Sequence, residues 1–255
     1  MQKDKFKILR VLSILISALT IFASVGGILL DNLYRDNPFV TLVWKTTDAV
    51  TLFVAVPILA AGLYFSSRGS ARGLLVLLAM LDYTFYNSAY YLFGASFNWF
   101  FLIYVAIVVL SAAALIVGLI EIDASWLKRQ FQEKTPVRWI SGYMLFVAVG
   151  LTAIYLMMIF ALDLTMVVPV FLIGAVWLWK RKPWGFVLGG ISVIKGAVYT
   201  LVLTVVTIAA SNGGFPESAS EIPLWATLSA SGIVASLVLL MNLKSHPESA
   251  SHLST

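Results

Sequence analysis

The sequence predicts an all-α fold, a polytopic membrane helical bundle with about eight transmembrane helices. Of its 255 residues, 60% are apolar and only 11% are Asp, Glu, Lys or Arg, and its mean hydropathy is +0.94. Soluble domains are nearer half apolar and a quarter charged, so a water-soluble globule is excluded. The apolar residues fall in runs of about 20, which is the length of a bilayer-spanning helix, and they lack the period-two alternation of a membrane barrel.

The expected spans, in chain order, are residues 9–30, 47–65, 73–94, 97–120, 139–161, 164–180, 184–210 and 223–243. We expect the first to be a retained helix, because its apolar run from Val11 to Leu30 is longer than the core of a signal peptide. Four polar clusters near span ends are interpreted as helix caps and solvated loops rather than ligand sites. They are Asp36-Asn37-Pro38, Thr47-Asp48, Asp163 and Glu221-Ile222-Pro223.

No connecting segment is long enough to form a second domain, so residues 1–244 are expected to form one integral membrane domain. The longest segment, residues 121–138, has mixed charge and an amphipathic pattern, which predicts a linker along the membrane surface. It separates two four-helix halves that start on the same side, so an internal duplication would be a 4+4 parallel pseudo-repeat. Residues 245–255 are predicted to be a disordered cytoplasmic tail.

The distribution of Lys and Arg predicts the orientation of the bundle. With the N- and C-termini cytoplasmic, 14 of the 17 basic residues lie in inside segments, Arg35 and Lys45 lie outside, and Lys195 lies within a span. Cytoplasmic loops of membrane proteins carry this excess. The net charge of +5 is therefore a topology signal. We expect the lipid bilayer as the environment and no nucleic-acid partner.

The sequence lacks the residues that intramembrane enzymes use. It contains no cysteine, and its two histidines, His246 and His252, both lie in the predicted tail. Serine proteases need a Ser–His pair, zinc hydrolases need clustered His ligands, and nucleotide-binding loops need a Walker A sequence. We therefore predict no catalytic, metal-binding or cofactor-binding residues and no enzyme activity.

Two ionisable side chains other than tyrosine are expected deep within the spans, Asp82 and Lys195. Asp82 follows Arg72 by ten residues and Lys195 follows Trp184 by eleven, which places both about 15–17 Å from the inner edge of the bilayer. A charge at the bilayer centre costs about 2.5–3.5 kcal/mol on insertion scales, so it needs a partner, water or neutralisation. Opposite signs and matching depths predict an ion pair across the bundle interior.

Polar side chains around this pair predict an intramembrane polar site. Helical spacing places Asp82 and Tyr86 on one stripe of the third span, and Tyr83, Asn87 and Tyr90 on the next, so this helix should face the bundle interior. In span seven, a ridge of small residues should let another helix approach closely: Gly185, Gly189, Ser192 and Gly196. The predicted site comprises Asp82, Tyr83, Tyr86, Asn87, Tyr90, Lys195 and Tyr199.

Three functions are open for such a site. We expect a small-molecule or ion transporter, or a channel-like protein, with a polar cavity between spans three and seven. The alternative is a non-transporting sensor or assembly protein whose polar residues hold helices together by hydrogen bonds. A retinal-type chromophore protein, with Lys195 forming the Schiff base, is third. Retinal proteins usually carry a carboxylate one turn before that lysine, and this chain has Ile191 and Ser192 there.

Three segments between the first loop and span seven carry a resemblance to other sequences: Tyr34–Val40, Tyr86–Asn98 and Arg181–Gly196. On these residues the chain resembles a family of uncharacterised multi-spanning membrane proteins of bacteria and archaea. The resemblance implies a multi-pass protein of the prokaryotic cytoplasmic membrane and implies no activity. Asp82 stands where the resemblance would place an uncharged residue.

Labelling of an introduced cysteine tests the orientation, because the chain has no cysteine of its own. Ser70→Cys lies in a loop predicted to be cytoplasmic, so a membrane-impermeant maleimide should label it only in opened cells. Arg35→Cys lies in the predicted outer loop and should react in intact cells. If Ser70→Cys reacted from outside intact cells, the orientation would be the reverse.

Overall fold

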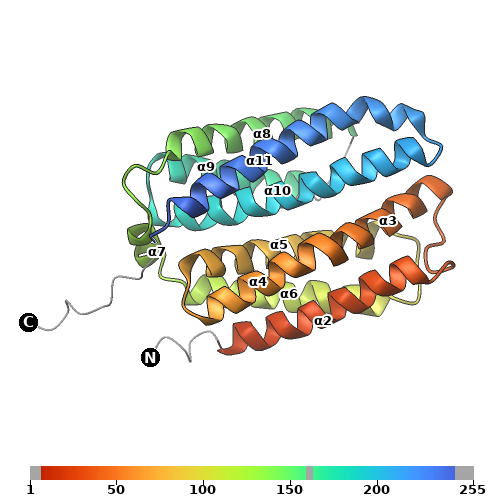
Figure 1. Ribbon diagram of the computed structural model, residues 1–255, viewed down its shortest axis with the longest axis horizontal. Coiled ribbons are helices and arrows are strands. Elements are labelled where there is room, and N and C mark those ends of the chain that lie inside the picture. Colours follow the sequence, from red (N-terminus) through yellow and green to blue (C-terminus); the bar gives the residue numbers. More distant parts are fainter. Residues whose placement is uncertain (1–6, 159–162, 245–255) are drawn as a thin grey trace, which may run out of the picture.

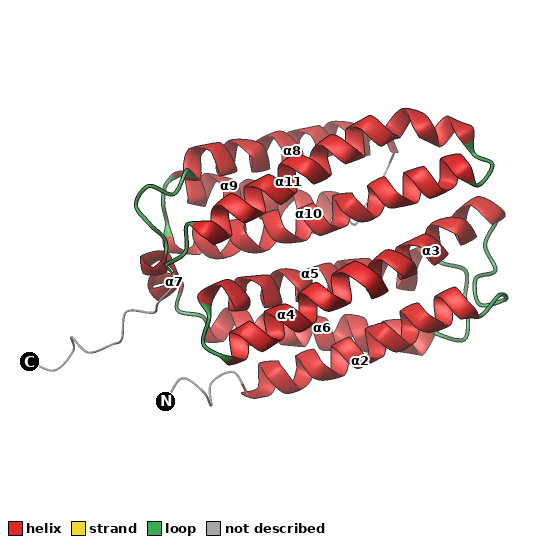
Figure 2. Cartoon of the chain, viewed as in Figure 1, coloured by secondary structure: helices red, strands yellow, loops and turns green. Residues whose placement is uncertain are grey.

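The structure is a computed structural model that describes residues 7–158 and 163–244. Across these residues the regular secondary structure is helical (Figure 2). One isolated bridge joins Phe131 and Leu243. The predicted tail, including His246 and His252, lies outside the described residues, as does the predicted end of span five at residues 159–161. The all-helical expectation is confirmed for the described chain.

The helices form long rods that correspond to the predicted spans. The first half contains α2 (Lys7–Leu29), a continuous rod of α3 (Pro38–Val50), η1 (Thr51–Ala55) and α4 (Val56–Ser67), then α5 (Ala71–Gly94) and α6 (Phe101–Glu121). A short helix, α7 (Ala124–Gln130), forms part of the predicted linker. The second half contains α8 (Val137–Met158), η2 (Asp163–Val167) with α9 (Val168–Trp179), α10 (Pro183–Asn212), and η3 (Pro216–Glu221) with α11 (Ile222–Met241).

The second rod begins at Pro38, so the predicted start at residue 47 is wrong. Asn37 caps the helix by accepting a hydrogen bond from the Val40 N–H, and Pro38 occupies the first turn, where a missing N–H costs nothing. The helix then continues through Thr47-Asp48, whose polarity suggested a boundary. Asp48 is consequently an interior residue of this rod.

Five of the described helices are long and apolar enough to cross a membrane, which indicates a membrane protein. They are Lys7–Leu29, Pro38–Ser67, Phe101–Glu121, Pro183–Asn212 and Pro216–Met241. α5 has 24 residues, but its aspartate, asparagine and tyrosines lower its mean hydropathy. α8 and α9 contain shorter apolar helices, Val137–Gly150 and Val168–Trp179. By length and composition, therefore, five helices and not eight satisfy this test.

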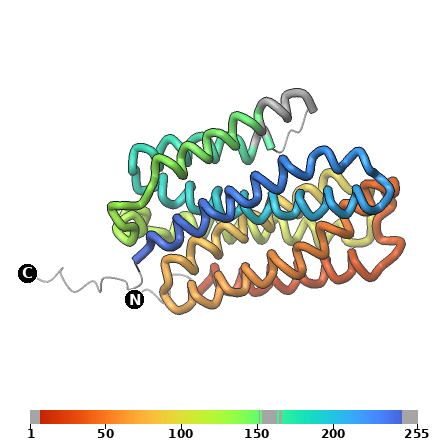
Figure 3. Tube along the Cα trace, turned by 45° about the horizontal axis from the view of Figure 1, so that its top comes forward, coloured from red at the N-terminus to blue at the C-terminus, as the bar shows by residue number. Residues whose placement is uncertain are grey.

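The rods form two layers with roughly parallel long axes (Figure 1), and Figure 3 shows the same rods turned by 45°, with the green helix α8 on the outside. One layer contains α2 to α6 and the other contains α8 to α11, while α7 lies at one end. Within each half, the second rod packs on the third and the third on the fourth, and the first rod contacts the second and the fourth. α10 joins the layers by packing against α5 and α3, and it also contacts α7.

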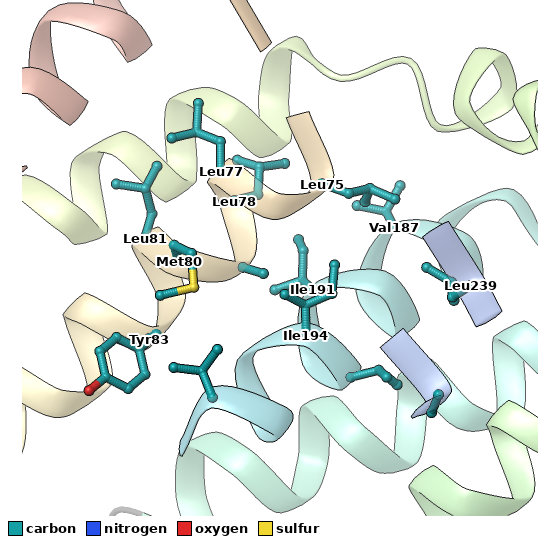
Figure 4. Close-up of a cluster of buried hydrophobic side chains, with 14 of the residues drawn as sticks. Leu75, Leu77, Leu78, Met80, Leu81, Tyr83, Val187, Ile191, Ile194 and Leu239 are labelled. Atoms are coloured by element: carbon teal, nitrogen blue, oxygen red, sulfur yellow. The ribbon is translucent and has the colours of Figure 1, made fainter. Parts of the chain in front are cut away.

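Part of the contact between α5 and α10 is a buried apolar interface. Figure 4 shows Leu75 of α5 beside Val187 and Ile191 of α10, with Leu239 of α11 close by. All four side chains are buried. Gly190 allows this approach, because a Cβ there would lie 3.0 Å from a Leu75 methyl carbon. The interface holds α5 and α10 together on one side of the polar residues described below.

The two hairpins α4–α5 and α9–α10 have matching geometry. α9 begins and ends 112 positions after α4, and η2 begins 112 positions after η1. A Cβ on Gly73 would lie 2.4 Å from the Ser66 nitrogen, and a Cβ on Gly185, also 112 positions later, would lie 2.3 Å from the Leu178 nitrogen. Each glycine thus lets α5 or α10 touch the backbone of the preceding helix. The predicted close approach at the small-residue ridge is confirmed for Gly185, and the partner is α9.

Replacement of one close-contact glycine tests this packing. Gly185→Ala should lower the melting temperature in detergent, because the new Cβ would overlap the backbone at Leu178. Gly142→Ala is the matched control: nothing lies within 4 Å of its added Cβ, and alanine is favoured over glycine in a helix by about 1 kcal/mol. Equal melting temperatures for the two variants would contradict the close α9–α10 approach.

Candidate intramembrane polar site

The predicted ion pair is present, near the midpoints of α5 and α10. Lys195 Nζ lies 3.1 Å from Asp82 Oδ2, and the Lys195 side chain is 7% exposed while that of Asp82 is 22% exposed. Lys195 is on α10 and Asp82 is on α5, so the pair connects the two layers. Removing two charges from water is costly, and close approach with further polar contacts offsets that cost.

A second carboxylate, Asp163 at the start of η2, belongs to the same cluster. It is 2% exposed and accepts hydrogen bonds from the hydroxyls of Tyr86 and of Tyr90, the latter at 2.5 Å. The ring of Tyr86 also lies 4.2 Å from Lys195 Nζ, in cation–π geometry. The Lys195 ammonium acts electrostatically on the Asp163 carboxylate. Lys195 therefore has carboxylates from both α5 and η2 in its surroundings.

The structure brings most of the predicted site residues together. Tyr199 packs edge-on against Tyr86, with ring centroids 4.9 Å apart, and stacks on Tyr90 at 6.4 Å. We use the name Lys195 cluster for Asp82, Tyr86, Tyr90, Asp163, Lys195 and Tyr199. Two predicted residues lie outside it: Tyr83 contacts Thr51 Oγ1 through its hydroxyl at 2.9 Å, and Asn87 is buried on α5.

The prediction of only two deep ionisable groups is wrong, because Asp48 and Asp163 are both buried. Asp48 is 3% exposed and accepts hydrogen bonds from Tyr34 at 2.5 Å and from Tyr91 at 3.1 Å. Gly27 makes room for it, because a Cβ there would lie 1.8 Å from Asp48 Oδ2. Both carboxylates are buried, so the interpretation of these residues as solvated helix caps is wrong.

Two cavities adjoin the Lys195 cluster. One of about 130 Å³ lies between α6, α9 and α10 and is lined by Asp82, Ser192 and Lys195. The other, of about 30 Å³, is bounded by Asp163, Lys195, Tyr199 and apolar side chains of α8 and α11. The first has room for several water molecules and the second for about one. Between α5 and α10 themselves the faces are packed, so the predicted cavity lies beside their contact and not within it.

The larger cavity presents an unused polar group. Ser192 is 1% exposed, and its hydroxyl has no hydrogen-bond partner among the described residues. A buried hydroxyl without a partner costs about 1–3 kcal/mol, so a water molecule or a small polar solute in the cavity would be stabilised there. Asp82 and Lys195 line the same cavity and would contact the same occupant.

The charges of the Lys195 cluster do not cancel. Two carboxylates face one ammonium, so with all three groups ionised the cluster carries one net negative charge. In a low-dielectric interior, that charge favours the binding of a proton or another cation. The arrangement can therefore hold a cation. Lys195 is close to both carboxylates, so an added cation and the lysine ammonium would compete for them.

Comparisons with protein families, curated proteins and solved structures give no match. The resemblance noted in the sequence therefore stays a prediction, and the function must be argued from the site.

A double-mutant cycle tests the coupling within the pair. Lys195→Met should lower the melting temperature in detergent, because it leaves two buried carboxylates without a cation, and such losses are about 3–5 kcal/mol. Asp82→Asn should cost less, because Lys195 keeps Asp163 nearby. The double variant should recover part of the Lys195→Met loss, whereas additive losses would contradict the coupling.

The exposed pair of Lys45 and Asp31 is the control for this cycle. Its Nζ–Oδ1 distance is 3.2 Å, close to that of the buried pair, but the Asp31 side chain is 92% exposed. Lys45→Met and Asp31→Asn should each change stability by about 1 kcal/mol or less, because surface pairs are weak. A similar cost at both sites would show that burial does not strengthen the Lys195 interaction.

Proposed function

We propose that this chain is a membrane transporter or channel-like protein for a small solute or ion, with the Lys195 cluster as its binding site. The observation that carries the proposal is the position of Lys195, a buried cation that adjoins two carboxylates and two cavities. Charged groups inside membrane proteins commonly mark ion or substrate pathways. The net negative charge of the cluster favours a cation, either as the substrate or as the coupling ion.

The proposed mechanism uses Lys195 as a movable counter-charge. In the structure its ammonium is paired with Asp82, and Asp163 is held by two tyrosine hydroxyls. A proton or metal cation arriving at Asp82 would release Lys195 toward Asp163, and its departure would reverse the step. The flexible four-carbon stem of lysine permits such a change without movement of the helix backbone.

We further propose that all eight rods cross a prokaryotic cytoplasmic membrane, with the α7 end and both termini inside. The shorter α8 and α9 and the polar α5 would cross as members of the bundle, where other helices cover their polar groups. The matched bounds and glycine contacts of α4–α5 and α9–α10 support a parallel 4+4 duplication. The cluster then lies at the interface of the two repeats, where transporters commonly bind their substrates.

A structural role is the second candidate. The cavities of about 130 and 30 Å³ are smaller than the 300–1,000 Å³ pockets that hold drug-sized ligands. In a sensor or assembly protein, the cluster would fix the packing of the two halves without binding a solute. The same small volumes leave no room in this conformation for a retinal-sized chromophore on Lys195.

Ion flux through reconstituted protein tests the proposal. Proteoliposomes are exposed to sudden gradients of H⁺, Na⁺ or K⁺, and the resulting current is measured on a solid-supported membrane. Wild-type protein should give a current with at least one cation. Asp163→Asn should abolish that current, because it removes one negative charge of the cluster and keeps a hydrogen-bond acceptor for the tyrosines.

Asp48→Asn is the matched control for this experiment. Asp48 is also a buried carboxylate held by two tyrosines, but it is not part of the Lys195 cluster. It should retain the wild-type current. Equal loss in both variants, or no current from folded wild-type protein with any of the three cations, would favour the structural role.

A further inference from the structure

The end of the bundle that carries α7 is strongly basic. Among the described residues, this end carries twelve basic residues (Lys and Arg) and three acidic residues (Asp and Glu). The opposite end carries two basic and four acidic residues, when the charged residues half-way along the helices are left out. Three exposed tryptophans also lie here, Trp139, Trp179 and Trp184. Indole rings favour the boundary between lipid tails and headgroups. Basic side chains at this end therefore lie at the depth of lipid phosphates.

A cleft of about 540 Å³ at this end concentrates the positive charge. It lies between α7, the loop that follows α7, the start of α10 and the end of α11. Lys128, Arg129, Arg181 and Lys244 line it, and Glu133 is its single acidic residue. The four basic residues come from three separate parts of the chain, because Lys128 and Arg129 are neighbours on α7, and these parts meet only in the folded structure. Lys244 is held in place by its backbone N–H, which donates to the Gln130 carbonyl at 2.8 Å.

Arg181 is fixed at the edge of this cleft. Its backbone has φ 50°, a left-handed conformation that glycine adopts at lower cost than arginine. Its guanidinium donates to the Thr135 carbonyl at 3.0 Å, which ties the α9–α10 turn to the loop after α7. A guanidinium has five N–H donors, and its planar fork suits phosphate oxygens.

The floor of the cleft is apolar. Phe131 and Phe186 line it, their side chains are buried, and their ring centroids lie 4.7 Å apart. A free phosphate ion would use only the basic rim, whereas a lipid would place its phosphate at the rim and its glycerol and first methylenes against Pro183 and the exposed edges of the two rings. A basic cleft with an aromatic floor at the membrane boundary therefore matches an anionic phospholipid.

We infer that this cleft binds the phosphate headgroup of an anionic phospholipid, such as phosphatidylglycerol. The inference does not depend on the proposed transport function. Bound lipid would bridge α7, the start of α10 and the end of α11. The Gln130–Lys244 backbone bond and the Phe131–Leu243 bridge already join the end of α7 to the chain after α11, and the Phe131–Phe186 ring contact joins it to α10. The lipid would thereby stabilise the packing of α7 on α10.

Lipid titration of the full chain in detergent, followed by native mass spectrometry, tests the inference. Wild-type protein should bind phosphatidylglycerol more tightly than phosphatidylcholine. The double variant Lys128→Gln/Arg129→Gln should weaken phosphatidylglycerol binding by about fivefold for each charge removed. Arg181→Gly should also weaken it, and because glycine relieves the backbone strain, this variant should not unfold the protein.

The control variant Lys7→Gln/Arg68→Gln removes two charges from the same end of the bundle but outside the cleft. It should keep the wild-type affinity, and an equal loss would overturn the assignment to the cleft. Inorganic phosphate is the second control. If it bound with the affinity of phosphatidylglycerol, or displaced the lipid at equal concentration, the site would be one for free phosphate and the lipid inference would be wrong.

Discussion

The burial of the Lys195 ammonium is the constraint on which the rest of the interior depends. Inside a dry bundle, an uncompensated charge is far more costly than a paired one. Asp82 supplies the direct partner from α5, while Tyr86 and Asp163 complete the surroundings from α5 and η2. These contacts require α5, α10 and η2 to meet at one depth. The buried apolar contact at Leu75 and Ile191 adjoins these groups on one side, and the two cavities adjoin them on the other.

The sequence predicted the ion pair because its logic is local. A charge within an apolar run needs a partner, and each of the two runs contained one obvious candidate. It did not predict Asp48 or Asp163, because their identity as caps or interior residues depends on where the helices begin. The Asp48 rod starts at Pro38, and tyrosines from the first loop and α5 satisfy its carboxylate. Those donors are distant in sequence, so only tertiary packing reveals them.

The positions of the rods depend on local sequence, whereas the apolarity of each rod depends also on tertiary packing. The apolar runs predicted the positions of most rods to within a few residues, since bilayer-length helices are set by local composition. Hydropathy alone undervalues α5, because this helix is covered by α4, α6 and α10 and is not required to be apolar all round. Its tyrosines and Asp82 place their polar groups in the interior of the bundle. The small residues of span seven were informative from the sequence alone. Close approach of two helices needs a residue without a Cβ, and a glycine supplies one.

The proposed duplication explains why the charged site lies where it does. Thr51 and Tyr83 in the first half correspond, 112 positions earlier, to Asp163 and Lys195 in the second. In the first half these positions form a neutral hydrogen bond of 2.9 Å between α5 and the start of η1. In the second half they hold an acid and a base at the same place, α10 and the start of η2. The Thr51–Tyr83 contact is complete within its own half, whereas Lys195 forms its ion pair, at 3.1 Å, with Asp82 of the other half. The charged version therefore belongs to the interface of the two halves, and a change in its protonation or occupancy would act directly on their packing.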